Sequence, residues 1–483
     1  TVWSDAHGYI PQAIARGARV VIAQRPAAEL GLTVPPGVAY LTVPDTAAAA
    51  AWLAAAWHGF PSHRLVVVGI TGTDGKSSTA QILHTLLHTA GIRAGMLSTI
   101  KAIIGDAEEP LPLHVTTPEA PLVQAYLRRM VDAGLTHAIL ETTSHALALG
   151  RVTAVAFDVA VVTNITHEHL DIHGSWENYF AAKQRLFESL LPEAAWRVDG
   201  SAAKAAVRKT AVLNLDDVSF ARLGALPVPR LAYGLQPEAD VHASDVRHTP
   251  TATEFTLHLP GRAPQAVTSR LVGAFNVANM LAAAAAAHAL GVAETAVPRG
   301  LAAVEGIRGR MERVDRGQPF QVIVDFAHTP VSLEKALGVA RQMTAGRVIA
   351  VFGSAGQRDV DKRRLMAQVS ARDADLTVLT AEDPRTESLD DILALMAAGA
   401  RAGGGVEGRT FWRIPDRGRA IYHALTLAAP GDIVLICGKG HEQSMCFGAV
   451  EHPWDDRAAT LAALDAFLAG EPMVDLGLPT FAA

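Results

Sequence analysis

Cysteine is nearly absent from this sequence of 483 residues, which contains only Cys437 and Cys446. Two cysteines cannot form a disulfide framework or a four-cysteine zinc ribbon. Small disulfide-stabilised proteins and zinc ribbons are therefore excluded as classes.

Long apolar runs are absent as well. No stretch approaches the ~18 apolar residues that a membrane-spanning helix needs. The alanine-rich segments 47–57 and 280–290 predict packed helices instead. The first residues also lack the basic-then-apolar pattern of a signal peptide. We therefore expect a soluble cytoplasmic protein with no membrane span.

Positive charge is not in excess. The 42 lysines and arginines are outnumbered by 48 acidic residues, which gives a net charge of −6. This balance gives no indication of a nucleic-acid or anionic-membrane partner. Hydrophobic residues make up 49% of the chain, enough for a sizeable core.

Apolar strand-like runs alternate with helical segments along the chain. Examples are GARVVIA near the start, HRLVVVGIT in the middle, and FQVIVDFAH and DIVLICGKGHE near the end. This alternation predicts an α/β protein with parallel sheets covered by helices. Ligands then belong at the carboxyl ends of the strands. At roughly 100–200 residues per domain, two to four domains are expected.

The stretch GITGTDGKSST follows the apolar run Leu65–Val68 and precedes a helical segment. A glycine-rich turn in this context favours a phosphate-binding loop, because backbone N–H groups can approach the phosphates. Lys76 supplies a positive charge, and the Ser77 hydroxyl can bind Mg²⁺. The spacing is not the standard one, since Ile70 occupies the first glycine position. An ordinary glycine turn before a helix is the alternative.

Three histidines, a glutamate and an aspartate lie within NITHEHLDIHG, from Asn164 to Gly174. His169 and His173 are four residues apart, as zinc-binding pairs on a helix are. The order H-E-x-x-H is absent, so a zinc protease is poorly supported. Beside a phosphate loop, Mg²⁺ is favoured, with one histidine and carboxylates from neighbouring strands completing its shell. For His167 and His173 the expected role is packing or support of a ligand.

A lysine occurs on an apolar helix face in YFAAKQRLF. Phe180, Lys183 and Phe187 are spaced so that they share one face. On this pattern alone, the favoured interpretation is a lysine whose ammonium reaches solvent along the apolar surface. The alternative is a desolvated and therefore reactive amine.

Together these segments resemble the Mur ligases, the ATP-dependent amide-forming enzymes of peptidoglycan synthesis. The resemblance spans about Leu65 to Gln443. Its motifs occur in family order: TGTDGKSST, ETTSHAL, NITHEHLDIHG, YFAAKQRLF, GAFNVANMLAA, GRMERV, VDFAHTP, AEDPR and GKGHEQ. It is closest to the branch that adds a diamino acid to UDP-N-acetylmuramoyl-L-alanyl-D-glutamate.

The resemblance implies an α/β fold with three-domain Mur ligase architecture. Residues 1–63 would be a shortened UDP-sugar-binding domain. Residues 64–305 would be a central ATPase domain with a phosphate loop and a parallel sheet. Residues 306–483 would be a Rossmann-like domain that binds the amino acid. The implied cofactors are ATP and Mg²⁺. The implied partners are the UDP-muramoyl dipeptide and the diamino acid, and we expect a monomer.

The resemblance also implies roles for individual residues. The catalytic residues would be Lys76, Glu141, His169 and Lys183, and Lys183 matches a lysine that becomes carbamylated. The metal ligands would be Ser77, Glu141, His169 and Lys183. The ATP-binding residues would be Gly72, Thr73, Asp74, Gly75, Lys76, Ser77, Ser78, Asn276, Asn279, Arg310, Asp325 and His328. The UDP-muramoyl peptide would contact Thr116, Thr117, Thr143 and Arg151. The amino acid would contact Arg358, Glu382, Asp383, Arg385, Gly438 and Glu442.

Some positions depart from the family pattern. Asp74 stands where the family usually has asparagine, and Leu149 replaces a polar residue near the peptide substrate. The start resembles the middle of the family's N-terminal domain. A Mur-type ligase acting on another acid, such as a folylpolyglutamate synthase-like enzyme, and a non-catalytic nucleotide-binding protein therefore stay as alternatives.

The resemblance implies that the segment AEDPR, which ends at Arg385, contacts the side chain of the incoming diamino acid. Arg385 could pair with the second carboxylate of meso-diaminopimelate, which lysine and ornithine lack. Glu382 and Asp383 stand where diaminopimelate enzymes usually have aspartate and asparagine. They could instead neutralise Arg385 or bind the distal ammonium of lysine or ornithine. The arginine favours meso-diaminopimelate.

Overall fold

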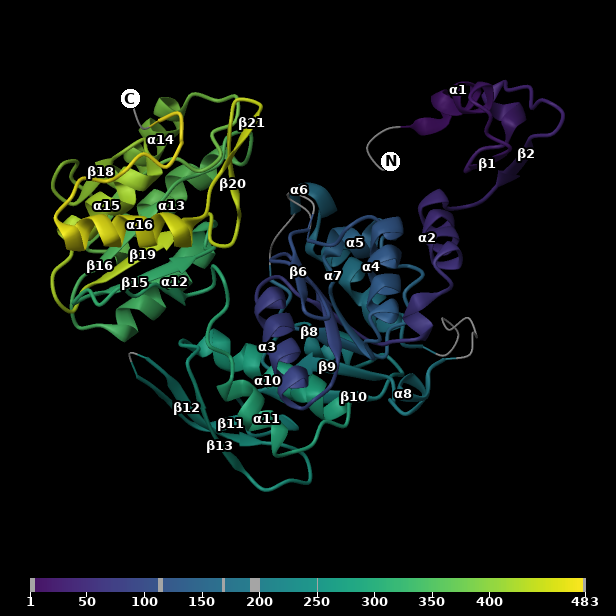
Figure 1. Ribbon diagram of the computed structural model, residues 1–483, viewed down its shortest axis with the longest axis horizontal. Coiled ribbons are helices and arrows are strands. Elements are labelled where there is room, and N and C mark those ends of the chain that lie inside the picture. Colours follow the sequence, from purple (N-terminus) through teal and green to yellow (C-terminus); the bar gives the residue numbers. More distant parts are fainter. Residues whose placement is uncertain (1–4, 112–115, 167–169, 192–199, 250, 481–483) are drawn as a thin grey trace. The chain divides into compact units, whose positions relative to one another are not determined.

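The computed structural model describes residues 5–111, 116–166, 170–191, 200–249 and 251–480. The chain separates into two compact units (Figure 1). The first comprises Thr1–Ser244, Thr256–Val267 and Val277–Ala303, and the second comprises Asp245–Phe255, Thr268–Asn276 and Val304–Ala483. Both contain a mainly parallel sheet, so the predicted α/β class is confirmed.

A small α/β segment opens the first unit. Its strands β1 (Val20–Ala23) and β2 (Ala39–Thr42) are parallel and follow helix α1 (Ile10–Ala15). Asp45 then caps helix α2 (Thr46–Trp57), because its carboxylate accepts hydrogen bonds from the first N–H groups of the helix. The alanines of α2 pack against Ala120 and Ala154.

The main sheet of the first unit is built around β3 (Val66–Thr71), the strand predicted to precede the phosphate loop. Every residue of β3 is buried, as in a parallel strand covered on both faces. The spatial order of the sheet is β13 (Gln265–Ser269), β12 (Thr253–His258), β11 (Val241–His248), β10 (Arg230–Gly234), β9 (Thr210–Asn214), β8 (Val159–Val162), β3, β7 (His137–Glu141), β4 (Ala94–Leu97), β5 (Ala102–Ile104) and β6 (Ala107–Glu109).

Strands β4, β7, β3, β8 and β9 run parallel to one another. Their carboxyl ends therefore meet at one edge, where the phosphate loop begins. The helices of this unit are α3 (Lys76–Thr89), α4 (Ala120–Asp132), α5 (Ser144–Ala148), α6 (Leu170–His173), α7 (Trp176–Glu188), α8 (Ala202–Ala205), α9 (Phe220–Leu223), α10 (Ala274–Ala289) and α11 (Ala296–Ala302).

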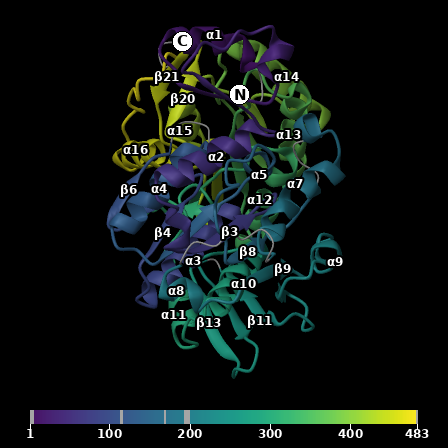
Figure 2. The same ribbon diagram turned by 90° about the vertical axis from the view of Figure 1, so that its right-hand side faces the viewer.

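The two faces of this sheet are covered by different helices. Helices α4 and α7 contribute Leu127, Phe180 and Phe187 to one core. Helices α3 and α10 lie side by side with α11 (Figure 2). A side chain at Gly300 of α11 would lie 2.7 Å from the backbone of Leu86 in α3, so only glycine allows this close approach.

The sheet of the second unit has the spatial order β14 (Glu312–Arg313), β15 (Gln321–Asp325), β19 (Ile433–Cys437), β16 (Val348–Phe352), β17 (Leu376–Leu379) and β18 (Phe411–Arg413). Only the short β14 is antiparallel to its neighbour. Two cores cover the two faces. One contains α12 (Pro330–Met343), α13 (Val360–Asp373) and α14 (Leu389–Ala402), and the other contains α15 (Arg417–Leu427) and α16 (Asp456–Ala469).

A hairpin of β20 (Ser444–Phe447) and β21 (Val450–Pro453) follows this sheet. None of the helices in the part of the chain that the structure describes is both long and apolar enough to cross a membrane.

A buried ion pair ties α15 to α16 at the carboxyl end of this second sheet. Arg417 donates two hydrogen bonds of 2.7 Å to Asp456, and both side chains are completely buried. Asp456 also accepts a hydrogen bond of 2.8 Å from the indole of Trp454. Arg417 also donates hydrogen bonds to the carbonyls of Ala381 and Cys437.

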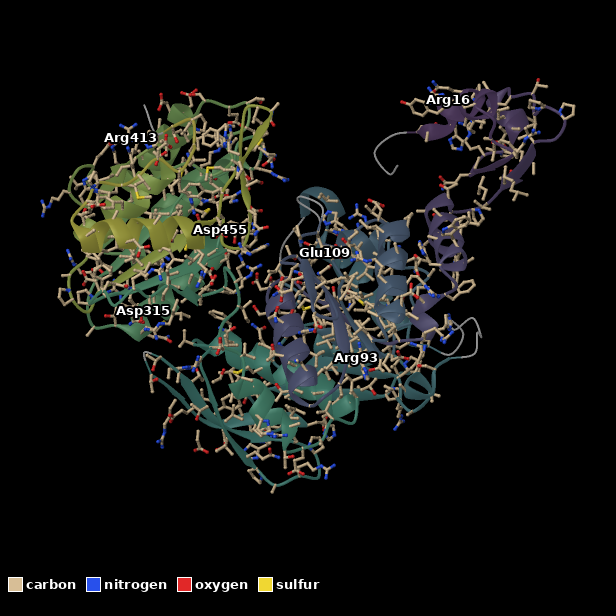
Figure 3. All side chains as sticks on the ribbon, in the orientation of Figure 1. Arg16, Arg93, Glu109, Asp315, Arg413 and Asp455 are labelled. Atoms are coloured by element: carbon tan, nitrogen blue, oxygen red, sulfur yellow. The ribbon has the colours of Figure 1, made fainter. Side chains whose placement is uncertain are left out.

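We expect Asp456→Asn to lower the free energy of unfolding of this unit by about 3–5 kcal/mol, because it leaves a buried guanidinium without its counter-ion. Urea unfolding followed by tryptophan fluorescence measures the loss. The matched control is Glu407→Gln, which breaks the exposed ion pairs of Glu407 with Arg401 and Arg413 (Figure 3) and should cost about 1 kcal/mol. Equal losses in the two variants would contradict the assigned role of the buried pair.

Candidate active site

The phosphate loop runs from Gly72 to Gly75, between β3 and α3. Both glycines have positive φ angles, 152° and 82°. A side chain at Gly72 would lie 1.8 Å from the hydroxyl of Thr163, and one at Gly75 would lie 2.3 Å from Asn279 Oδ1. Both positions therefore require glycine. Ile70, at the position of the missing first glycine, lies buried within β3.

Asn164 holds this loop from the neighbouring strand end. Its backbone carbonyl accepts from the N–H of Thr73 at 2.7 Å, and its side-chain oxygen accepts from the N–H of Asp74 at 3.0 Å. Lys76, the first residue of α3, bends back so that Nζ donates to the carbonyl of Thr73 at 2.8 Å. The first turn of α3 and this ammonium together form an anion-binding site.

A cluster of oxygen atoms lies beside this loop. The carboxylate of Glu141, at the end of β7, accepts hydrogen bonds from Ser77 Oγ (2.9 and 3.0 Å) and from the N–H and hydroxyl of Thr99 (2.8 and 3.0 Å). Thr116 Oγ1 lies 3.1 Å from Thr99 Oγ1. Thr99 was not among the expected site residues, although its position two residues after the buried strand β4 is a signal for a site residue.

These oxygen donors suit Mg²⁺, which prefers hard ligands and usually keeps water and substrate phosphates in its shell. Within the described residues, no group of three or more histidines, cysteines or carboxylates forms a complete protein cage for a metal. Ser77 and Glu141 are thus brought together, while His169 lies outside the described residues. His173 packs against Tyr179 and lies 3.1 Å from Ser144 Oγ, as the packing interpretation expects.

Lys183 is buried in α7 between Phe180 and Phe187, with 1% of its surface exposed. Its Nζ donates to the carbonyl of Gly72 at 2.7 Å and lies 4.5 Å from the centre of the Tyr179 ring. The interpretation of an ammonium that reaches solvent is therefore wrong. The helix face points into the phosphate-loop side of the sheet, so the amine ends beside the loop instead.

Four residues predicted to contact the UDP-muramoyl peptide surround the end of β7. Thr117 Oγ1 donates to the carbonyl of Glu141 at 2.8 Å and accepts from the N–H of Thr143 at 3.2 Å. Arg151 donates to the carbonyl of Thr117 at 3.0 Å and pairs with Glu119 at 2.6 Å. Thr116 is linked to Glu141 through Thr99, so hydrogen bonds connect these residues to the end of β7.

The two predicted asparagines of α10 have different surroundings. Asn279 lies against Gly75 and 3.4 Å from Thr79 Oγ1, so it reaches the phosphate loop. Asn276 donates to the carbonyl of Val272 at 2.8 Å, within its own segment.

In the second unit, Asp325 ends β15 and accepts hydrogen bonds from the N–H groups of Met311 and Ala327, at 2.7 and 2.8 Å. These bonds fix the two loops that carry Arg310 and His328. Both side chains pack against the ring of Phe326, at 4.6 Å and 4.4 Å from its centre. The structure therefore brings Arg310, Asp325 and His328 together.

The segment 382–385 follows β17 at the same edge of the sheet. Asp383 and Arg385 both have positive φ angles, 38° and 54°. Hydrogen bonds to the backbone of Cys446 hold this turn against β20: Cys446 N–H donates to Asp383 at 2.9 Å, and Arg385 N–H donates to the Cys446 carbonyl at 3.0 Å. This contact between the segment 382–385 and the β20–β21 hairpin was not predicted from the sequence.

The two acidic residues of this segment do not pair with Arg385. Asp383 accepts two hydrogen bonds, of 2.9 and 3.0 Å, from the buried ammonium of Lys439, which also pairs with Glu442 at 2.6 Å. Although burial alone lowers it, the pKa of Lys439 is raised by these two carboxylates. Among the described residues, no carboxylate forms an ion pair with Arg385.

Glu382 is buried between the glycine loops that follow β16 and β19. A side chain at Gly438 would lie 2.5 Å from its Oε2, which has no hydrogen-bond partner among the described residues. Burial raises the pKa of Glu382. Arg358 is exposed in the loop after β16, and that loop is fixed by a hydrogen bond of 2.9 Å from Gly356 N–H to the carbonyl of Asp383.

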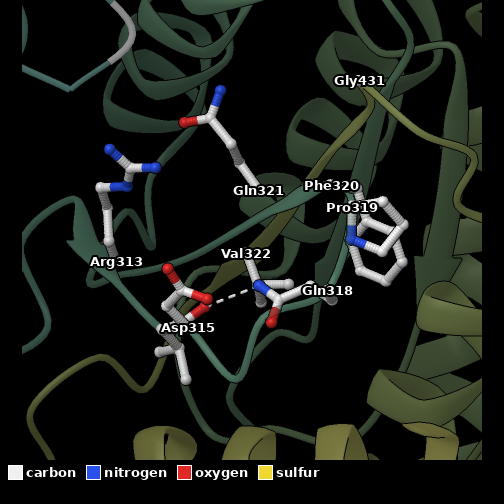
Figure 4. Close-up of a pocket in the computed structure, with 9 residues that line it drawn as sticks. Arg313, Asp315, Gln318, Pro319, Phe320, Gln321, Val322 and Gly431 are labelled. Atoms are coloured by element: carbon white, nitrogen blue, oxygen red, sulfur yellow. Dashed lines mark hydrogen bonds between the residues drawn. The ribbon is translucent and has the colours of Figure 1, made fainter.

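A pocket of about 250 Å³ occurs elsewhere in this unit (Figure 4). It lies at the amino-terminal ends of β15 and β19, the edge opposite to Asp325. It is lined by Arg313, Val314, Asp315, Gln318, Pro319, Phe320, Gln321, Val322 and Gly431. None of the predicted site residues lines it.

Comparison with protein families gives two matches along the chain. Residues 70–287 match the model described as the Mur ligase middle domain. Residues 309–440 match the model described as Mur ligase, glutamate ligase domain. The two matches contain the phosphate loop and the segment 382–385.

Individual relatives match over almost the whole chain. A UDP-N-acetylmuramyl-tripeptide synthetase of Roseiflexus sp. (strain RS-1) is 46% identical over 95% of this chain and 90% of the relative. A UDP-N-acetylmuramoyl-L-alanyl-D-glutamate–2,6-diaminopimelate ligase of Geobacillus thermodenitrificans (strain NG80-2) is 42% identical over the same shares.

A solved structure of a UDP-N-acetylmuramoyl-L-alanyl-D-glutamate–2,6-diaminopimelate ligase is 29% identical, covers 95% of this chain and 89% of that one, and has a TM-score of 0.65. The family matches, the relatives and the phosphate-loop geometry agree: this chain belongs to the Mur ligase family, the ATP-dependent ligases of peptidoglycan synthesis.

Proposed function

We propose that this chain joins a diamino acid to UDP-N-acetylmuramoyl-L-alanyl-D-glutamate, with cleavage of ATP to ADP and phosphate. The observation that carries the proposal is the phosphate loop, where Lys76, the Ser77–Glu141 pair and the buried Lys183 converge. The names of the relatives support the substrate class.

The chemistry follows from the need to activate a carboxylate. The D-glutamate carboxylate attacks the γ-phosphorus of ATP, and ADP leaves, which gives an acyl phosphate. The deprotonated amine of the diamino acid then attacks the acyl carbon, and phosphate leaves. Lys76 and the first turn of α3 bind the β- and γ-phosphates and offset their charge. Gly72, Thr73, Asp74, Gly75, Ser78 and Asn279 shape the loop that holds them.

Mg²⁺ would neutralise charge on the transferred phosphoryl group, with Ser77, Glu141, His169 and the modified Lys183 as its protein ligands. We assign Lys183 as a carbamate. Its neutral amine adds CO₂, an N–C bond forms and one proton is released, so a cation becomes an oxygen anion. Burial supports this assignment, because a desolvated lysine loses its proton more easily.

The proposal gives the remaining residues binding roles. Thr116, Thr117, Thr143 and Arg151 hold the UDP-muramoyl peptide, and Asn276, Arg310, Asp325 and His328 contact ATP. Arg358, Glu382, Asp383, Arg385, Gly438 and Glu442 form the amino-acid site. Arg358, Gly438 and Glu442 receive the head group of the amino acid. Asp383 acts through Lys439, to which it is hydrogen-bonded.

We also propose the domain boundaries 1–63, 64–305 and 306–483, for UDP-sugar, ATP and amino-acid binding. The protein would act in the cytoplasm as a monomer. Gel filtration with light scattering tests the monomer.

Phosphate release should require Mg²⁺, the UDP-muramoyl dipeptide and a diamino acid together, because the acyl phosphate forms on the dipeptide. A coupled phosphate assay with each component omitted in turn measures this requirement. Glutamate with a folate acceptor is the control for a folylpolyglutamate synthase-like enzyme. Phosphate release with that acceptor alone, or no acceptor-dependent release at all, would contradict the proposal.

Meso-diaminopimelate is the diamino acid that the site supports best. Arg385 has no ion-pair partner among the described residues, so its guanidinium is available to a second carboxylate. If the substrate were lysine or ornithine, Asp383 would be a candidate to bind its distal ammonium. Asp383 is already paired with Lys439. The acidic pair therefore neither neutralises Arg385 nor offers two open carboxylates.

Arg385→Ala should lower kcat/KM for diaminopimelate about 30-fold or more, the equivalent of ~2 kcal/mol. Any weak activity with lysine should change little, because lysine has no second carboxylate. Arg413→Ala, which removes an exposed arginine of the same unit, is the control (Figure 3). A wild-type preference for lysine or ornithine would contradict the arginine argument.

A further inference from the structure

Phe326 is a partly exposed aromatic residue directly after β15, and no role in the reaction has been given to it above. Its ring is the common neighbour of three side chains. The Arg310 guanidinium lies 4.6 Å from the ring centre, and the imidazoles of His328 and His441 lie at 4.4 and 4.7 Å.

Arg310 is held in an unusual way. Its guanidinium lies over the Phe326 ring. It makes no ion pair or side-chain hydrogen bond with any residue that the structure describes. A cation–π contact uses the face of the guanidinium and leaves its N–H edges available. Phe326 therefore fixes the direction of a cation without occupying its donors, which is what recognition of a phosphate needs.

Phe326 also orients His328 through its backbone. The carbonyl of Phe326 lies 3.0 Å from His328 Nδ1. Because a carbonyl only accepts, Nδ1 carries the proton in this contact, and the tautomer of the neutral ring is set.

His441 backs the ring from the loop after β19. It is buried, and its Nδ1 has no hydrogen-bond partner among the described residues. Burial, together with the charges of Arg310 and Arg308, holds the pKa of His441 well below its ordinary value. This shift favours the neutral imidazole, which adds no positive charge beside Arg310.

We propose that Phe326 is a positioning residue that aligns Arg310 and His328 for the phosphates of ATP, with the buried His441 as its support. The inference rests on the proposed function, which assigns Arg310 and His328 to ATP. It adds a residue that acts through these two groups and does not itself touch the transferred phosphate.

The test compares two phenylalanines at opposite ends of β15. Phe326→Leu keeps an apolar side chain but removes the aromatic face. It should lower kcat/KM for ATP about tenfold, between the effects of an exposed and a desolvated cation–π contact. The KM for the diamino acid should stay within about twofold. Phe326→Tyr keeps the face and should retain activity within about threefold.

Phe320→Leu is the matched control, because Phe320 is a buried aromatic residue just before the same strand, in the pocket of Figure 4. It should lower the melting temperature and leave kcat/KM for ATP unchanged. In addition, Phe326→Leu should have almost no further effect in an Arg310→Ala background, since the ring acts through that arginine.

Several outcomes would overturn the inference while the proposed function stands. These are an active wild type with unchanged kcat/KM for ATP in Phe326→Leu, equal losses in the leucine and tyrosine variants, or fully additive effects with Arg310→Ala. A wild-type chain that shows no diamino-acid-dependent turnover would overturn the proposed function and this inference together.

Discussion

Lys76→Ala is expected to lower turnover by about 100- to 1,000-fold, the cost of removing one charged donor from a transferring phosphoryl group. Lys76 is the first residue of α3 and now donates to the carbonyl of Thr73 at 2.8 Å. That contact is local and replaceable, so the loss should come from the reaction and not from folding. Single-turnover measurement of phosphate release, with saturating substrates, separates the chemical step from binding.

The control is Lys335→Ala, which removes an exposed lysine of α12 and should leave turnover unchanged. Near wild-type turnover in a Lys76→Ala protein with unchanged secondary structure would contradict the role of the phosphate loop in phosphoryl transfer.

Lys183→Ala is expected to be nearly inactive and to recover part of its turnover when short carboxylic acids are added. The added acid would supply the oxygen anion that the carbamate normally provides. Lys183 is buried and its Nζ lies beside the Tyr179 ring, so acetate or formate should be more effective than a longer acid. Phosphate release against acid concentration measures the recovery.

Lys183→Arg should be inactive, because it keeps a cation where the reaction needs an anion. Lys204→Ala is the matched control. Lys204 is a partly buried lysine of the same unit, paired with Asp158, so its loss should lower stability without any rescue by carboxylic acids. A fully active arginine variant would show that no carbamate is needed.

The elements that carry the site could be predicted because their patterns are local. The apolar run of β3, the glycine turn and the periodicity of α3 are contiguous, and they specify a strand–loop–helix unit without long-range information. The spacing of Phe180, Lys183 and Phe187 likewise placed the lysine on the buried face of α7.

The contacts of that lysine could not be predicted from the same pattern. Whether an ammonium on an apolar face reaches solvent depends on what covers the end of the side chain. Here Gly72 and Tyr179, more than a hundred residues and four residues away in the sequence, cover it. The interpretation of a solvent-exposed ammonium was wrong for this reason.

The same limit applies to the amino-acid segment. AEDPR indicated a binding loop, but its partners come from other elements. Lys439, which follows β19, donates hydrogen bonds to Asp383. The β20–β21 hairpin holds the turn through a hydrogen bond from the N–H of Cys446. The cluster around Phe326 joins three separate motifs in the same way. Such pairings depend on strand order, which local periodicity does not specify.

The most direct test of the central claim is mass spectrometry of the product formed from ATP, Mg²⁺, UDP-N-acetylmuramoyl-L-alanyl-D-glutamate and an equimolar mixture of diaminopimelate, lysine and ornithine. A single dominant product should appear, with the mass of the dipeptide substrate plus diaminopimelate minus one water. It should form in the same molar amount as ADP. A product carrying lysine or ornithine would contradict the specificity argument. ADP formation without any peptide product, or no product at all, would contradict the ligase assignment.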